Sequence, residues 1–235
     1  MSAWLNCKLS LLFTSVLLYS VSMFAQGYEP SFPRDEAKKI QESDRFVIWD
    51  VTWYKGASIG LREHKLDQVS VTLTGGAVKV TRPDGTWNIE QERTGSVRFV
   101  PKGTVDSEEG ISVEPSRTIV FQLKDLALAK WATTEGIPGQ FPRVGTAKLF
   151  ETDRVIVWDE TWKPGERIAP HFHYSQAAAV FLEGGTIRTI SDQGVPQSLL
   201  SRKPGDVINI TAPLKAPHAE EGVDGSPRAI WIEFK

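Results

Sequence analysis

An intramolecular disulfide is excluded by this sequence, which holds one cysteine, Cys7, among 235 residues. A single cysteine cannot close an intramolecular disulfide, so the fold has to rest on its hydrophobic core. Blocks of basic residues are also lacking, and a formal net charge of −2 with a pI of about 6.1 gives no footprint of a nucleic-acid partner. A hydrophobic content of 40% and eight tryptophans suffice for the core of one large domain or two small ones.

Long hydrophobic runs are equally scarce, with one exception at the N-terminus. Lys8 is followed by the apolar run 9–24 and then by Ala25, a pattern typical of a secretory signal peptide. We predict a signal peptide over residues 1–25, with Ser22 as a rival cleavage site. A retained anchor is the alternative, although the run is short for a membrane span of about 20 residues. Removal of the peptide would leave an exported, cysteine-free protein, periplasmic or secreted, with no membrane association.

An internal repeat organises the rest of the chain. A Trp-Asp pair and a histidine recur at a constant offset, since 158 − 49 and 173 − 64 both equal 109. Later in each copy the offset becomes 218 − 106 = 112, so the second copy has gained three residues. The repeated features include Phe32-Pro33-Arg34 with Phe141-Pro142-Arg143, Thr52-Trp53 with Thr161-Trp162, and Gly56 with Gly165. The repeat predicts two tandem domains, 26–124 and 141–235, joined by a linker over 125–140.

Each copy is rich in short β-forming segments that are separated by turn residues. Gly75-Gly76 and Gly184-Gly185 each predict a hairpin turn. Helical character is limited to residues 125–131 and to a short turn over residues 35–43. Many short strands with evenly spaced turns predict an all-β sandwich or barrel.

Three of the four histidines fall in the second copy. His171 and His173 are two residues apart in an extended segment, so both imidazoles would point to the same side of a strand. His218 follows a Lys-Pro-Gly-Asp turn. Because imidazole is the commonest metal ligand in proteins, the pattern predicts a three-histidine metal site inside a β-barrel. The alternative is a set of hydrogen-bonded or surface histidines that bind no metal.

Two motifs around these histidines resemble those of the cupin superfamily. The first motif consists of Gly165, His171 after five intervening residues, His173 after one more, and Gly184 further on. The second consists of Pro204-Gly205-Asp206, followed by Pro213 and His218. The match covers the second copy directly and the first copy through the repeat. The resemblance implies a bicupin, with two tandem double-stranded β-helical (jelly-roll) barrels after the signal peptide and a degenerate N-terminal copy.

The same resemblance implies one divalent transition metal at His171, His173 and His218, with positions left open for water, oxygen or substrate. Iron, manganese, nickel, copper and zinc all accept such ligands. The glutamate ligand of the family falls near Ala177, which cannot bind a metal, and the adjacent Gln176 could supply an amide oxygen instead. Three neutral imidazoles and a divalent cation would sum to a charge of +2, which suits an anionic substrate or hydroxide.

The first copy has lost this ligand set. Arg62 stands at the position of His171 and Asp106 at that of His218, so that only His64 remains. A permanently charged arginine argues against a metal, and we expect Arg62 to pair with Asp106 in a structural domain. A residual metal site of His64 and Asp106 is the alternative.

Several other residues are candidates for roles around the metal. Glu220 and Glu221 are acid/base or ligand-orienting candidates, with a solvated carboxylate pair as the alternative. Arg188 and Arg228 could contact a substrate carboxylate, although each could equally be a surface charge. The aromatic and aliphatic candidates for the substrate lining are Phe172, Phe181 and Ile210. The repeated Trp-Asp-x-Thr-Trp signature is expected to serve packing.

These features together predict an exported, metal-dependent cupin that acts on a small organic molecule. The resemblance permits a three-histidine dioxygenase, with a lyase or isomerase as the enzymatic alternative. A non-enzymatic secreted protein that binds a small ligand is the second class. A structural shell with a relic site is the third. We expect a monomer or a homodimer.

Overall fold

The computed structural model describes residues 27–125, 131, 133, 135–212 and 216–235. Every regular element in these ranges is a β-strand, which confirms the predicted all-β class. The described ranges contain no helix that is long and apolar enough to cross a membrane. The predicted signal peptide and most of the predicted helical segment 125–131 lie outside the described residues.

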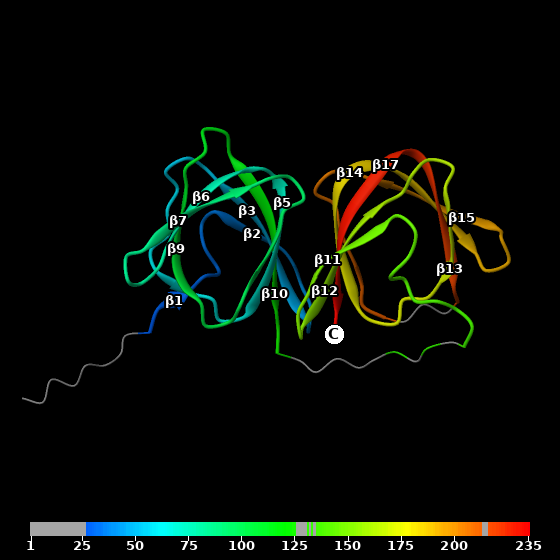
Figure 1. Cartoon of the computed structure of the whole chain (residues 1–235), viewed down its shortest axis with the longest axis horizontal. Coiled ribbons are helices and arrows are strands. Elements are labelled where there is room, and N and C mark those ends of the chain that lie inside the picture. Colours follow the sequence, from blue (N-terminus) through cyan, green and yellow to red (C-terminus); the bar gives the residue numbers. More distant parts are fainter. Residues whose placement is uncertain (1–26, 126–130, 132, 134, 213–215) are drawn as a thin grey trace, which may run out of the picture.

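The first half of the chain, residues 27–125, forms two five-stranded sheets (Figure 1). Their strand orders are β1-β4-β9-β6-β7 and β2-β3-β10-β5-β8. The central strands β3 and β10 are almost continuously buried, because both of their faces are covered. The strands are β1 (Glu29–Pro30), β2 (Ala37–Glu42), β3 (Phe46–Trp53), β4 (Arg62–Glu63), β5 (Asp67–Thr74), β6 (Gly76–Thr81), β7 (Trp87–Glu92), β8 (Val97–Val100), β9 (Val105–Gly110) and β10 (Ser116–Leu123).

The second half, residues 135–235 without 213–215, forms one seven-stranded sheet. Its main order is β11-β12-β17-β14-β15, with β13 paired to β17 and β16 paired to β14. The strands are β11 (Thr146–Glu151), β12 (Val155–Thr161), β13 (Arg167–His171), β14 (Ala177–Ser191), β15 (Pro196–Arg202), β16 (Val207–Ile210) and β17 (His218–Phe234).

Strand β14 is longer than the sequence predicts. The hairpin turn expected at Gly184-Gly185 is absent, because β14 continues through both glycines and pairs with β17 on either side. The register shifts between Glu183 and Gly185, and Gly185 has a φ of +152°. A Cβ at Gly185 would lie 2.5 Å from the carbonyl oxygen of Asp224. The two glycines therefore bend a continuous strand at a bulge and do not reverse the chain.

The helical turn predicted over residues 35–43 is wrong. Ala37–Glu42 forms β2 and pairs antiparallel with β3. The hydrogen bonds of this ladder outweigh the weak helical preference of the lysine, glutamine and glutamate residues in the segment. The equivalent strand of the second half, β11, pairs with β12 in the same way.

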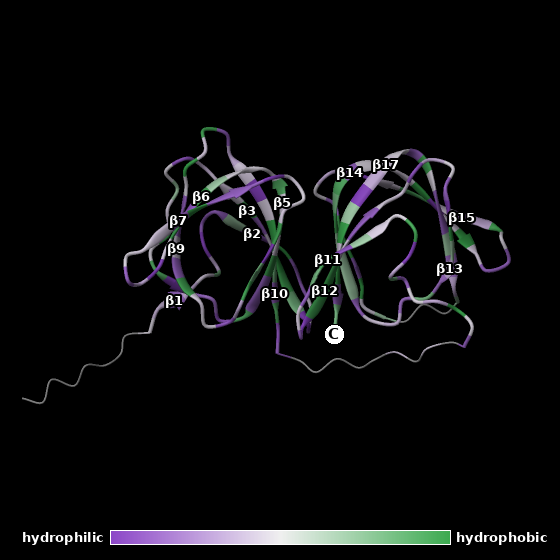
Figure 2. Cartoon of the chain, viewed as in Figure 1, coloured by the Kyte–Doolittle hydropathy of each residue, from purple (hydrophilic) through white to green (hydrophobic). Residues whose placement is uncertain are grey.

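The two halves share one hydrophobic core. A continuous cluster of buried side chains joins β3, β5 and β10 of the first half to β12, β14 and β17 of the second. Phe46 and Phe234 stack across the junction with ring centroids 5.5 Å apart. Figure 2 shows the hydrophobic residues gathered along β10 and β12, where the halves meet. The halves therefore bury their inner sheets against each other.

The junction repeats the internal symmetry of the sequence. Asp50 accepts two hydrogen bonds from Arg117, at 2.9 and 2.7 Å, and Asp159 accepts two from Arg228, at 3.0 and 2.7 Å. Each arginine also lies against a glycine of the opposite half, Arg117 at Gly205 and Arg228 at Gly95. The four tryptophans of the repeated signature lie in the separate core cluster of their own half, which agrees with the packing role expected for them.

Candidate metal centre

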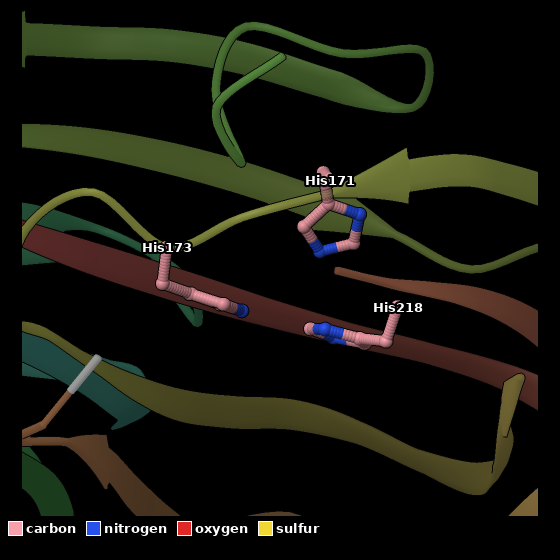
Figure 3. Close-up of side chains that lie close together, drawn as sticks. All are labelled: His171, His173 and His218. Carbon is pink, nitrogen blue, oxygen red and sulfur yellow. The ribbon is translucent and has the colours of Figure 1, made fainter. Parts of the chain in front are cut away.

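Two neighbouring strands bring the three histidines together (Figure 3). His171 ends β13 and His218 begins β17, and the two residues are register partners across this pair of strands. Phe172 lies between His171 and His173 in the sequence, and its amide donates to the carbonyl of Pro138 at 3.0 Å, which ties this segment to the residues before the second half's first strand. The ring centroids are 4.5 Å apart for His171 and His218, 5.5 Å for His171 and His173, and 5.4 Å for His173 and His218.

One potential ligand atom from each histidine lies within 4.8 Å of the other two. Burial, with a further contribution from the charge of Arg143, lowers the pKa of His171 to about 4. Burial and the neighbouring His171 lower the pKa of His173 to about 2. Both rings are therefore neutral at pH 7, with a lone pair available. The Nδ1 atoms of His173 and His218 are buried without a hydrogen-bond partner. Converging neutral imidazoles with unpartnered nitrogens fit a divalent transition metal.

A charged network that the sequence interpretation missed lies directly beside the histidines. Arg143 donates from Nη1 to His171 Nε2 at 2.7 Å and from Nη2 to Glu220 Oε2 at 2.8 Å. Its Nε donates to Glu160 Oε1 at 2.5 Å. Trp162 Nε1 donates to the same oxygen of Glu220 at 3.0 Å. Arginine, carboxylates and imidazoles therefore form one buried cluster.

The two carboxylates of this cluster differ in charge. Burial raises the pKa of Glu160, whose side chain is fully enclosed, to about 8, and the charge of Arg143 only partly opposes this. Burial would also raise the pKa of Glu220, but the close contact with His218 and the charge of Arg143 outweigh it and hold that pKa below its usual range. At pH 7 the charges of Arg143 and Glu220 therefore cancel.

Part of this network had a signal in the sequence. Arg143 and Glu220 are the counterparts of Arg34 and Glu108 in the first half, at the offsets of 109 and 112. In the first half Arg34 Nη1 donates to Glu108 Oε2 at 2.8 Å, so the arginine–glutamate pair is itself repeated. Glu160 has no such signal, because Val51 takes its place in the first copy.

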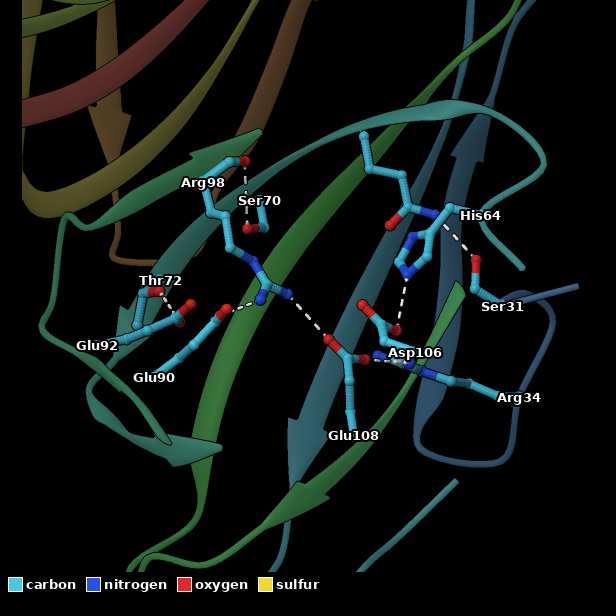
Figure 4. Close-up of polar contacts among 11 residues, drawn as sticks. Ser31, Arg34, His64, Ser70, Thr72, Glu90, Glu92, Arg98, Asp106 and Glu108 are labelled. Carbon is cyan, nitrogen blue, oxygen red and sulfur yellow. Dashed lines mark hydrogen bonds and ion pairs between the residues drawn. The ribbon is translucent and has the colours of Figure 1, made fainter. Parts of the chain in front are cut away.

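The first half holds a different cluster at the equivalent position (Figure 4). His64 Nε2 lies 3.1 Å from Asp106 Oδ1, and Glu108 accepts from Arg98 at 2.9 Å in addition to Arg34. The expected pairing of Arg62 with Asp106 is wrong. These residues face each other in the register of β4 and β9, but the carboxylate of Asp106 turns to the buried imidazole. Among the described residues, only the histidines of the second half form a group of three metal-ligating side chains.

The charged cluster of the first half predicts a loss of stability in acid. Burial would raise the pKa of Glu108, but the charges of Arg34 and Arg98 outweigh it and lower the pKa to about 2. Because the pKa in the unfolded chain is higher, at 4.5, the stabilisation is fully present above pH 4.5 and is lost as the pH falls toward 2. The shift corresponds to roughly 3 kcal/mol. Urea unfolding between pH 5 and pH 3 should therefore show a steeper decline for the unchanged protein than for Glu108→Gln, and parallel declines would contradict the assignment.

The predicted carboxylates have different environments. Glu220 is only 9% exposed, so a solvated pair is wrong for this residue: burial against Trp162 and Arg143 removes it from water. Glu221 points to the other face of β17 and pairs with Arg188 Nη1 at 3.1 Å. Arg228 is held by Asp159 at the junction of the halves.

The contacts that the structure gives for the remaining candidates are with residues other than the three histidines. Gln176 donates from Nε2 to the carbonyl of Thr211 at 3.2 Å, and Ala177 is buried in the core of the second half. Phe181 is also buried there, stacked on Trp162 with a centroid distance of 5.9 Å. The ring of Phe172 lies 5.8 Å from that of Tyr174.

A pocket of about 340 Å³ opens beside His218. The pocket is open to solvent and its lining mixes polar side chains with apolar surface, and the candidates Phe172, Phe181 and Ile210 do not line it. The lining residues are Thr189, Ser191, Asp192, Gln197, Ala216, Pro217 and His218. Since His171 and His173 are almost fully enclosed, His218 is the histidine through which the cluster reaches this pocket.

Comparison with solved structures identifies the fold. No family model matches the chain, and no protein of curated function matches its sequence. AerE from Microcystis aeruginosa is similar over 89% of this chain and 97% of its own, with a TM-score of 0.58 and 14% identity. A Cupin 2 conserved barrel domain protein from Leptotrichia buccalis is similar over 85% of this chain and 88% of its own, with a TM-score of 0.52 and 17% identity.

A third similar structure is the oxalate decarboxylase of Bacillus subtilis, which has been studied for its Mn(II) centres. It covers 82% of this chain and 69% of its own length, with a TM-score of 0.54 and 14% identity. At such low identity the likeness concerns the fold. The chain therefore has the fold of cupin-domain proteins and carries, in its second half, three histidines placed to bind a divalent metal.

Proposed function

We propose that this chain is an exported protein of two tandem cupin barrels, spanning residues 26–124 and 141–235, of which the second binds one divalent transition metal. The sequence repeat, the repeated arginine–glutamate and aspartate–arginine pairs and the shared core support the duplication. The apolar run after Lys8 supports export.

The proposed function of the second barrel is metal-dependent catalysis on a small polar molecule. The observation that carries it is the convergence of three imidazoles within 4.8 Å, one of which borders an open pocket. A bound divalent cation supplies Lewis acidity there, and three neutral ligands leave its full charge available to polarise a carbonyl or hydroxyl oxygen. Thr189, Ser191 and Gln197 supply hydrogen-bonding groups to orient such a molecule.

The carboxylates beside the histidines have a positioning role. Glu220 Oε1 lies 3.6 Å from His218 Nε2, while its other oxygen accepts from Arg143 and Trp162. With both oxygens turned to protein groups, Glu220 orients the histidine and does not face the pocket. Glu221 is paired with Arg188 on the opposite face of the strand. Proton transfer to a substrate would then fall to a pocket residue, and Asp192 is the carboxylate among the lining residues.

Lyase or isomerase chemistry on a hydroxy or carbonyl compound suits this environment. A pocket that is open to solvent does not exclude water, and the expected apolar lining of Phe172, Phe181 and Ile210 lies elsewhere. Dioxygenation is the second candidate, and the all-imidazole composition of the cluster favours it through the resemblance stated above.

Metal analysis combined with turnover tests this proposal. Protein produced without added metal should contain about one divalent transition metal per chain, and chelation should abolish turnover of small hydroxy acids and carbonyl compounds. Restoring the metal should restore turnover, with no oxygen uptake for a lyase or isomerase and stoichiometric uptake for a dioxygenase. If a metal-free protein binds the same compounds equally well and no turnover occurs with metal, the chain is a binding protein and the enzymatic proposal is wrong.

A further inference from the structure

Arg143 contacts both carboxylates, Glu160 and Glu220, and one of the three histidines, His171. All three nitrogens of its guanidinium are engaged: Nε and Nη2 with Glu160, Nη2 also with Glu220, and Nη1 with His171. The side chain is 8% exposed. The guanidinium of Arg143 is therefore held by three protein side chains and has little contact with solvent.

The contact with His171 uses the lone pair that a metal would need. Arginine can only donate hydrogen bonds, and Arg143 Nη1 lies 2.7 Å from Nε2 of His171 and 3.1 Å from its Nδ1. Nδ1 also lies 3.1 Å from the carbonyl oxygen of Ala169, which can only accept, so the tautomer that satisfies both partners carries its hydrogen on Nδ1 and accepts from Arg143 at the nearer Nε2. The ring thus has one lone pair, on Nε2, and binding a metal through Nδ1 would break the bond to Ala169 and change the tautomer.

We infer that Arg143 and the metal compete for His171, so that the arginine closes the ligand set whenever the cation is absent. This inference rests on the proposed metal-binding function. The guanidinium satisfies the buried Nε2 of His171, and a cation has to displace it before all three histidines can bind. Arg143 is consequently a positioning residue that lowers the affinity for metal and remains anchored by Glu160 and Glu220 after it releases the ring.

The first half supplies the matched control. Arg34 occupies the equivalent position and donates to Glu108 at 2.8 Å, as Arg143 does to Glu220. Its guanidinium packs on Phe32 and Trp53, and Arg62 stands where His171 would be. The arginine–glutamate pair is thus common to both halves, whereas the contact with an imidazole belongs to the second half.

Zinc titration of three metal-free proteins tests this inference: the unchanged chain, Arg143→Lys and Arg34→Lys. Lysine keeps the positive charge beside the carboxylates, but it lacks the planar guanidinium that binds the carboxylates and the His171 ring simultaneously. We expect Arg143→Lys to bind Zn²⁺ about tenfold more tightly, the equivalent of one charge-assisted hydrogen bond, and Arg34→Lys to match the unchanged chain. Nitrogen-15 spectra of the unchanged metal-free protein should show His171 protonated at Nδ1, which needs no variant to fold.

Each result has a distinct meaning. If the unchanged chain binds zinc and Arg143→Lys binds it equally or more weakly, the competition is overturned while the proposed metal function stands. Protonation of His171 at Nε2 in the metal-free protein would also overturn it. If the unchanged chain and Arg143→Lys both fold and neither binds zinc, the proposed function itself fails, and the inference fails with it.

Discussion

Replacing His173 with alanine is expected to weaken the affinity for a divalent cation by on the order of 100-fold or more and to leave the fold intact. The variant removes one of three converging ligands, and the two that remain provide only a weak site. His173 donates and accepts no hydrogen bond through Nδ1, so no buried partner is left unsatisfied there. Zinc or cobalt titration of the metal-free protein measures the effect, and a thermal melt without metal confirms the fold.

The control for this variant is His64→Gln. His64 is the repeat counterpart of His173, but it lies 3.1 Å from Asp106 and belongs to no group of three ligands among the described residues. Glutamine can still donate to Asp106, so the buried carboxylate keeps a partner. Metal affinity should be unchanged in His64→Gln. Equal loss of affinity in both variants would mean that metal binding depends on the fold in general and not on the imidazole of His173.

The second large effect is expected from the shared core. Phe46→Ala should lower the free energy of unfolding by about 3–5 kcal/mol, because a fully buried aromatic ring is lost and a cavity remains. The ring stacks on Phe234 of the second half and packs edge-on against Phe121 of the first, with a centroid distance of 6.2 Å. Since the cluster is continuous across the junction, both halves should unfold in one transition before and after the substitution.

Calorimetry and urea unfolding measured by tryptophan fluorescence check this prediction. Leu199→Ala is the control, because Leu199 on β15 is 62% exposed and its loss should change the free energy of unfolding by no more than about 0.5 kcal/mol. Two separate transitions in the unchanged protein would contradict a common core. So would a Phe46→Ala protein in which the second half keeps its original melting temperature.

Much of the fold was predictable because it depends on local and periodic features. The repeat at an offset of 109 indicated the duplication, and the spacing of His171 and His173 placed both rings on one side of an extended segment. The position of Gly184-Gly185 was also informative, although the sequence predicted a hairpin turn there and the structure has a bulge within β14. Two glycines indicate that the backbone departs from a regular strand, but only the partner strand β17 decides between a turn and a bulge.

Other features depended on contacts between segments that are distant in sequence. The pairing of His218 with His171 follows from the register of β13 and β17, which places the ends of two separate segments opposite each other. The direction of Asp106 was decided by the nearby imidazole of His64, and not by charge complementarity with Arg62. Charge and sequence distance alone do not distinguish these partners.

By itself, the sequence determined the all-β class, the internal repeat and the three candidate ligands, because strand alternation, turn residues and motif spacing are local properties. Only the tertiary structure decided that Arg143 and Glu160 surround the ligands, that the apolar candidates do not line the pocket, and that the halves share a core. The reason is physical: burial, ion pairing and the direction of a side chain arise when separate strands meet, and the order of residues along one strand does not specify which neighbour it will meet.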